Sequence, residues 1–183
     1  MKLIVQFKSI GGVLVMKNIL VLNGSPRKKG KTNKLVNAFL KGAQNNHIDY
    51  FHLYDMEIRG CRGCESYRRN DTDNPCVQKD DMHHIYESFN RADIIVFASP
   101  IYFWTVTGPL KTAVDRLYAM LTAKGYGEFR KESVLIMTAG GADYTQAQKW
   151  YETFENNLNW VNLGEILGAH KIREAEELGK TIQ

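Results

Sequence analysis

The stretch Asn18-Ile-Leu-Val-Leu-Asn23, followed by Gly24-Ser-Pro-Arg-Lys-Lys-Gly-Lys-Thr-Asn33, decides the fold class of this chain. Four consecutive apolar residues between two asparagines are typical of a strand that is covered on both faces of a parallel sheet. A polar loop follows, and apolar residues then recur at the spacing of a helix, at Leu35, Val36, Phe39, Leu40 and Ala43. A strand, a loop and a helix in this order predict an α/β unit.

The rest of the chain repeats this alternation. Further strands are predicted at 48–53, 93–98 and 133–138, and a less regular one, interrupted by two glycines, at 163–169. Each is followed by a segment with helical spacing of its apolar residues. Five strands that alternate with five helices indicate an open parallel sheet with helices on both faces. Such sheets bind ligands at the carboxyl ends of their strands, so the loops after the first, third and fourth strands should form the site.

Bulk composition narrows the class of protein. With 183 residues, 44% hydrophobic and 24% charged, the chain fits one globular domain, expected at residues 16–183. Residues 1–15 are interpreted as an N-terminal extension, either from an upstream start codon or as an extra edge strand. They lack the cleavage site of a signal peptide, and no apolar run approaches the ~20 residues of a membrane span. Three cysteines make no disulfide framework, and together with the missing signal peptide they point to the reducing cytoplasm. No membrane partner is expected, because no apolar run is long enough to span a bilayer.

The loop after the first strand carries the densest group of basic residues. The helix behind it offers unpaired N–H groups and a partial positive charge, which attract phosphate. We predict an anion site whose short polar side chains stand at capping-type positions and whose arginine offers a two-pronged donor. Its members are Ser25, Arg27, Lys31, Thr32 and Asn33. The simpler alternative is an ordinary helix cap with solvated lysines. Nucleic acid is not expected as a partner, because the basic residues form one local group rather than a long stripe.

Two other phosphate motifs fit this loop poorly. A P-loop needs four residues between its glycines, whereas five separate Gly24 from Gly30. It also needs a magnesium-binding aspartate at the end of a later strand, where this chain has Ser99-Pro100. The Gly-x-Gly-x-x-Gly fingerprint of dinucleotide-binding folds is absent after the first strand.

The loops after the third and fourth strands are predicted to contact the same ligand. Ser99-Pro-Ile-Tyr-Phe-Trp104 places three aromatic residues in a row at the end of a strand. They suit a planar, amphipathic ring system, which the loop's N–H groups could bond at its polar edge; packing against a helix or a second subunit is the alternative. The adjacent glycines of the fourth loop let backbone approach a ligand closely, unless this is a plain strand-to-helix turn. The predicted contacts are Pro100, Ile101, Tyr102, Phe103, Trp104, Thr138, Gly140, Gly141 and Tyr144.

These motifs together resemble the NADPH-dependent FMN reductase group, which includes the iron–sulfur flavoproteins and related NAD(P)H:quinone reductases. The resemblance rests on the first loop, on 99–104, and on Thr107-Gly-Pro-Leu-Lys111 with Asp115-Arg116. It implies a flavodoxin-like three-layer α/β sandwich that binds FMN, with its phosphate on the first loop and its isoalloxazine beside residues 100–104. It further implies NADPH or NADH as a transient co-substrate, a small-molecule electron acceptor such as a flavin, quinone or azo compound, and a homodimer or homotetramer.

The cysteines depart from the pattern of the cluster-bearing members. Those relatives carry four cysteines in a motif that begins Cys-x2-Cys-x2-Cys, whereas this chain has Cys61, Cys64, Tyr67 and then Cys76. Iron–sulfur clusters usually need four thiolates, so no metal site is predicted. A structural remnant of the motif and a redox disulfide between Cys61 and Cys64 both stay open.

Two other functions compete with an enzyme. One is a non-enzymatic electron carrier, although such carriers tend to be acidic and this chain has a formal net charge of +4. The other is a redox-sensing flavin-binding module, suggested by the unexplained cysteines. Because FMN carries the redox chemistry itself, no conventional catalytic acid–base pair is expected among the side chains.

Overall fold

The computed structural model describes residues 16–69, 75–123, 125, 127–141 and 143–182. The predicted extension at 1–15 lies outside these residues. No helix in this described part is long and apolar enough to cross a membrane.

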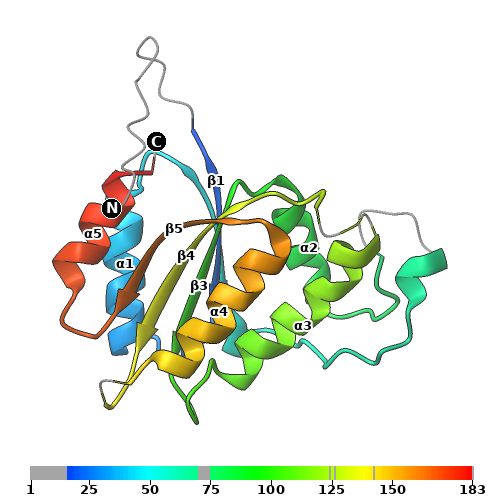
Figure 1. The fold of residues 1–183 in the computed structure, drawn as a ribbon, viewed down its shortest axis with the longest axis horizontal. Coiled ribbons are helices and arrows are strands. Elements are labelled where there is room, and N and C mark those ends of the chain that lie inside the picture. The colour runs from blue at the N-terminus through cyan, green and yellow to red at the C-terminus, as the bar shows by residue number, and fades with distance from the viewer. Residues whose placement is uncertain (1–15, 70–74, 124, 126, 142, 183) are drawn as a thin grey trace.

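Five parallel strands form one sheet in the order β2-β1-β3-β4-β5 (Figure 1). They are β1 (Asn18–Asn23), β2 (His47–His52), β3 (Ile94–Pro100), β4 (Glu132–Thr138) and β5 (Val161–Leu167). The predicted flavodoxin-like sandwich is thereby confirmed. The last strand begins two residues earlier than predicted, and a register irregularity at Gly164, where φ is +156°, explains its weak alternation.

Helices cover both faces of the sheet. They are α1 (Lys31–Gly42), α2 (Met82–Arg91), α3 (Gly108–Ala123), α4 (Thr145–Leu158) and α5 (Ile172–Lys180), with 3-10 turns η1 (Leu53–Asp55) and η2 (Ser66–Arg69). In Figure 1, α1 and α5 lie on one face, and α2, α3 and α4 lie on the other. Alternate residues of the central strands feed two separate apolar cores; Leu20 and Phe97 face the α2–α4 layer, while Val21 and Val96 face α1 and α5.

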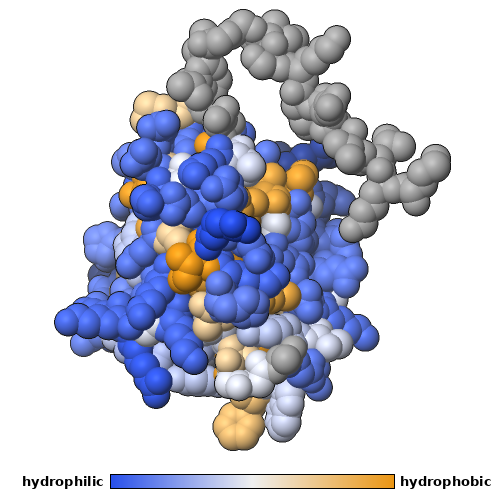
Figure 2. All heavy atoms as spheres, turned by 90° about the vertical axis from the view of Figure 1, so that its left-hand side faces the viewer, coloured by the Kyte–Doolittle hydropathy of each residue, from blue (hydrophilic) through white to orange (hydrophobic). Residues whose placement is uncertain are grey.

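The α1–α5 layer depends on two glycines at which the helix backbones meet. A Cβ added at Gly179 would lie 2.1 Å from the carbonyl oxygen of Phe39, and one added at Gly42 would lie 2.1 Å from that of Glu176. No side chain fits at either position, so the helices approach each other more closely than larger residues would allow. The outer surface of this layer is mostly hydrophilic, with small apolar patches between the charged side chains (Figure 2).

A long connection, residues 53–81, joins β2 to α2 and is here called the β2–α2 connection. Its two arms meet beside α3, where the N–H of Asp81 donates to the carbonyl of Glu57 at 3.2 Å. The buried side chain of Arg116 on α3 bonds both arms, as described below. The loops after β1, β3 and β4 are left free to converge at the carboxyl edge of the sheet (lower edge in Figure 1).

Candidate functional site

A cavity of about 520 Å³ opens where the loops after β1, β3 and β4 converge. We call it the anion cavity. Its lining residues are Ser25, Pro26, Arg27, Lys29, Gly30, Lys31, Thr32, Lys34, Pro100, Ile101, Tyr102, Thr138, Ala139 and Gly140. It lies beside the switch in strand order between β1 and β3, where open α/β sheets bind their ligands. Most of the residues predicted from sequence for the three loops therefore face one cavity.

The first loop is held in a tight turn by its own backbone and by Asn33. The N–H of Gly30 and the side-chain amide of Asn33 both donate to the carbonyl oxygen of Arg27, at 2.8 Å each. The side-chain oxygen of Asn33 accepts a hydrogen bond from Asn23. Because both ends of its amide are engaged, Asn33 shapes the loop, and its side chain does not line the cavity.

The helix cap differs from the predicted one. Gly30 is the N-cap of α1, and no side chain caps the helix. The first N–H groups of α1 therefore have no side-chain acceptor of their own, and they lie at the cavity wall with the buried Ser25 and Thr32. The hydroxyl of Ser25 has no hydrogen-bond partner among the described residues. Uncapped N–H groups beside an unpartnered hydroxyl are what an oxyanion needs from its site.

Thr107 links the first loop to the start of α3, although sequence reasoning gave it no role beyond its place in a motif. Its hydroxyl donates to the carbonyl oxygen of Gly24 at 2.7 Å, and its N–H donates to the hydroxyl of Ser99 at 3.0 Å. A Cβ at Gly24 would lie 2.5 Å from the Thr107 hydroxyl. The close approach at Gly24 therefore fixes the loop after β1 against the loop after β3. The clue in the sequence was that a small polar residue directly precedes the helix.

The loop after β3 is a tight hairpin with an exposed aromatic tip. Tyr102 and Thr105 exchange backbone hydrogen bonds at 3.0 and 3.2 Å, and the two residues between them, Phe103 and Trp104, have positive φ angles. Large side chains seldom adopt this conformation, and it turns both rings outward, so that Phe103 is 89% exposed. Only Tyr102 of the three aromatics lines the cavity.

This hairpin limits which N–H groups can meet a ligand. The N–H of Ile101 donates to the carbonyl of Thr138 at 2.8 Å, and that of Tyr102 is used within the hairpin. The N–H groups of Phe103 and Trp104 make no hydrogen bond within the described part of the chain. Burial, followed by the charge of nearby Tyr102, raises the pKa of Tyr54.

The loop after β4 forms a further wall of the cavity. Thr138 and Gly140 line the cavity, whereas Gly141 and Tyr144 do not. The Tyr144 hydroxyl accepts a hydrogen bond from the N–H of Ala139 at 3.1 Å, which folds the loop back on itself. The hydroxyls of Thr138 and Thr32 lie 2.7 Å apart and join this loop to the start of α1.

The electrostatics of the cavity favour an anion. Four cationic side chains line it, at Arg27, Lys29, Lys31 and Lys34, and no acidic residue of the described chain does. Lys28 in the same loop is drawn aside by Asp55, 2.6 Å away, and this contact lowers the pKa of the Asp55 carboxyl. The donors and charges fit a phosphate, and the cavity has the size of a small-ligand site, roughly 300–1,000 Å³.

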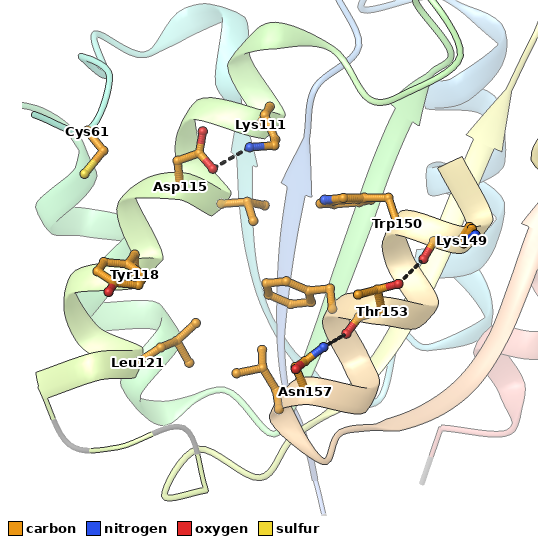
Figure 3. Close-up of a pocket in the computed structure, with 12 residues that line it drawn as sticks. Cys61, Lys111, Asp115, Tyr118, Leu121, Lys149, Trp150, Thr153 and Asn157 are labelled. Atoms are coloured by element: carbon orange, nitrogen blue, oxygen red, sulfur yellow. Dashed lines mark hydrogen bonds and ion pairs between the residues drawn. The ribbon is translucent and has the colours of Figure 1, made fainter. Parts of the chain in front are cut away.

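A second and larger cavity, of about 730 Å³, lies between α3 and α4. Figure 3 shows the Trp150 side chain reaching from α4 toward α3, with the Lys111–Asp115 ion pair across the gap and Cys61 at the rim. Its floor is apolar, with Val114, Leu121 and Leu158, and its Lys111 is already paired at 2.5 Å. Among the described residues that line this α3–α4 groove, the cations are the paired Lys111 and Lys149, whereas four cations line the anion cavity, so the smaller cavity offers the better fit for a phosphate.

Fold and site together define a flavodoxin-like α/β protein with a cation-lined cavity at the carboxyl edge of its sheet. Residues 17–172 match the family model described as NADPH-dependent FMN reductase, and the chain belongs to this family. FMN is the cofactor of the family and NAD(P)H its electron donor.

Several known proteins are similar to this chain. An iron–sulfur flavoprotein of Archaeoglobus fulgidus is 35% identical over 104 residues, which cover 56% of this chain and 46% of that protein. An iron–sulfur flavoprotein of Methanosarcina thermophila is 28% identical over 144 residues, covering 78% of this chain and 71% of that protein. Among the curated relatives most similar in sequence, the match thus spans about half of their length. The solved NAD(P)H:quinone oxidoreductase from Methanothermobacter marburgensis shares the fold, with a TM-score of 0.69, 18% identity, and coverage of 92% of this chain and 100% of that one.

Proposed function

We propose that this protein is an FMN-dependent NAD(P)H oxidoreductase that passes electrons from a nicotinamide cofactor to a small acceptor such as a flavin, a quinone or an azo compound. The observation that carries the proposal is the anion cavity, in which four cations, a helix N-terminus and a free buried hydroxyl meet at the strand switch of an FMN reductase fold. The name of the fold neighbour, an NAD(P)H:quinone oxidoreductase, agrees with this choice of acceptors.

The residues of the first loop would hold the phosphate of FMN. Ser25 and the first N–H groups of α1 donate hydrogen bonds, and Arg27 with Lys31 balances the charge of about −2 that a phosphate monoester carries. Thr32 is oriented by its bond to Thr138. The N–H groups of Phe103 and Trp104 are the free donors for the polar edge of the ring, which refines the wider range 101–104 expected from sequence.

Bound FMN would supply the redox centre, because its ring accepts a hydride from reduced nicotinamide and returns the electrons to an acceptor. The chain's own part is to fix the cofactor and to leave one face of its ring open. The cavity walls come from loops anchored by the Thr32–Thr138 and Thr107–Gly24 bonds, so the site is preformed.

The exposed hairpin also supports self-association. Phe103 is 89% exposed and Trp104 is 57% exposed, on a turn with positive φ angles. An apolar tip of this kind is stabilised when a second subunit covers it. We therefore propose a homodimer or homotetramer. Light scattering of the whole chain should give a mass above the 20.9 kDa of one chain, and Phe103→Ser should shift it toward the monomer.

The enzymatic proposal is tested by steady-state kinetics. The purified chain is loaded with FMN, and oxidation of NADPH and of NADH is followed with free FMN, a benzoquinone and an azo dye as acceptors. Turnover with at least one acceptor is expected. Ser25→Ala and Arg27→Ala should weaken FMN binding, whereas Lys149→Ala in the α3–α4 groove should not. No oxidation of either nicotinamide with any acceptor by the FMN-loaded chain would refute the proposal.

A further inference from the structure

The β2–α2 connection carries all three cysteines of the chain, and the structure gives each a different environment. Cys61 lines the α3–α4 groove (Figure 3). Cys64 is exposed, with its sulfur 3.6 Å from the Ser66 hydroxyl. Cys76 lines a separate hollow beside α2, together with His83 and Glu87. Cys61 and Cys76 thus face cavities that share no lining residue.

An iron–sulfur cluster, which the names of several relatives imply, does not fit this arrangement. Cubane and rhombic clusters are held by four converging thiolates, and the whole sequence has three cysteines. Within the described residues, no three His, Cys, Asp or Glu side chains gather as metal ligands would. At position 67, where the family motif has its third cysteine, the ring of Tyr67 packs edge-on against Tyr118 of α3, with 5.8 Å between the ring centroids.

Protein hydrogen bonds hold the connection instead. Arg116 is 1% exposed and reaches three groups of the connection. It donates to Asp80 at 2.6 and 3.1 Å, to the carbonyl oxygen of Arg59 at 2.8 Å, and to the sulfur of Cys76 at 3.3 Å. Asp80 in turn accepts the N–H of Arg59 at 3.1 Å. A single guanidinium therefore ties both arms of the connection to α3.

Asp80 is held in its ionised form by its hydrogen-bond partners. Burial by itself raises the pKa of Asp80, but the hydrogen bonds from Arg116 and from the Arg59 N–H outweigh burial, so that the pKa lies below its usual range. The Arg116 nitrogen that donates to Oδ1 of Asp80 also donates to the sulfur of Cys76. To ligate iron, Cys76 would have to leave this buried partner.

We propose that this chain holds no iron–sulfur cluster and that Arg116, paired with Asp80 and bonded to Cys76, is the positioning residue that fixes the β2–α2 connection on α3. If the proposed oxidoreductase function holds, electrons then have no one-electron relay away from the flavin within this chain. The acceptor must then meet the flavin ring itself, beside the anion cavity, as small molecules such as quinones, azo compounds and free flavins can.

The first test is a metal and sulfide analysis. The whole chain is produced with added iron and cysteine, purified without oxygen, and assayed for iron, acid-labile sulfide and visible absorbance before and after FMN loading. We expect flavin bands alone, with iron far below one atom per chain. Stoichiometric iron and sulfide with a broad absorbance that Cys76→Ser abolishes would overturn the proposal. Under the proposal, Cys76→Ser has the same spectrum and iron content as the unchanged chain.

The second test concerns Arg116. Arg116→Met leaves Asp80 buried without its cation, so limited proteolysis should cut the β2–α2 connection several times faster than in the unchanged chain. Arg116→Lys keeps the charge and should restore part of the protection. Equal protection in Arg116→Met, or opening of the connection by an iron chelator, would contradict the proposal. Nicotinamide oxidation is measured in parallel to separate the two proposals. If iron is bound and turnover is normal, only the absence of a cluster is contradicted. If iron is absent and there is no turnover, only the oxidoreductase function is contradicted.

Discussion

The hydroxyl oxygens of Thr32 and Thr138 lie 2.7 Å apart, although the two residues are 106 positions apart in the sequence. Both are buried, and both line the anion cavity. Their hydrogen bond joins the first turn of α1 to the end of β4 and so links two of the three loops that form the site. The cavity is therefore built on direct contacts between loops, each of which starts from a rigid strand.

Removing one of these hydroxyls should loosen the site more than the fold. Thr138→Val leaves the Thr32 hydroxyl buried without this partner, at a cost of about 1–2 kcal/mol. We expect the Kd for FMN, measured by quenching of flavin fluorescence, to rise about fivefold to thirtyfold. Thr153→Val is the matched control, because its hydroxyl bonds within the exposed face of α4 at the Lys149 carbonyl. An unchanged Kd in Thr138→Val would show that the bond does not shape the phosphate site.

The lysines of the anion cavity should make FMN binding dependent on salt. Lys29 and Lys34 line the cavity and make no ion pair among the described residues. Lys29→Ala and Lys34→Ala should each weaken binding about threefold to tenfold at low ionic strength, and the difference from the unchanged chain should shrink as salt screens the charges. Lys111→Ala serves as a control, because that lysine is paired with Asp115 in the other cavity. A loss that is the same at all salt concentrations would point to packing in place of charge.

Much of this architecture can be predicted from the sequence, because a strand that is buried on both faces has a continuous run of apolar residues. Val21 and Leu22 point to opposite cores, so both must be apolar, and β1 reads as a continuous run. The weak prediction was β5, where Gly164 interrupts the pattern and whose first residues are exposed. Local signals of this kind fix element types and bring the loop ends to one edge of the sheet.

The contributions of single site residues were less predictable, because they depend on contacts between distant segments. Asn33 looked like a phosphate ligand, yet its amide is used by Arg27 and Asn23. Lys29 and Lys34 lie outside the predicted set of site residues and nevertheless line the cavity. Sequence spacing alone does not tell which polar side chains form hydrogen bonds within the loop and which remain available to a ligand.

The contact between α1 and α5 gives a stability prediction. Gly179→Ala would place a Cβ 2.1 Å from the Phe39 carbonyl oxygen and 3.0 Å from the N–H nitrogen of Ala43. Backbone atoms cannot yield as a flexible side chain does, so the helices must separate, and we expect a loss of about 1–3 kcal/mol or more in the free energy of unfolding. Gly141→Ala, which meets nothing within 4 Å, should change it by less than about 0.5 kcal/mol. Urea denaturation followed by circular dichroism measures both; equal midpoints would disprove the close approach.

The buried Lys131 gives a pH dependence with a definite sign. It is 8% exposed, its ammonium group donates to the Ala92 carbonyl, and it lies 4.8 Å from the centre of the Phe89 ring. Burial lowers its pKa from 10.5 to about 8. Between these values the unfolded chain binds more protons than the folded one, so the free energy of unfolding should rise with pH from about 8 to 10. The full effect of such a shift is about 3 kcal/mol.

Replacing Lys131 by methionine isolates this effect. Lys131→Met keeps most of the apolar stem and removes the titrating group, so the rise in unfolding free energy between pH 8 and 10 should flatten. Lys149→Met, on α4 at the other cavity, should retain the slope of the unchanged chain. Urea midpoints at intervals across this range provide the comparison. The upper limit is set at pH 10 because burial raises the pKa of Tyr151 and Tyr86 above their usual value of 10.0, and above that pH their contribution has the opposite sign. A slope in Lys131→Met as steep as in the unchanged chain would assign the pH dependence to another group.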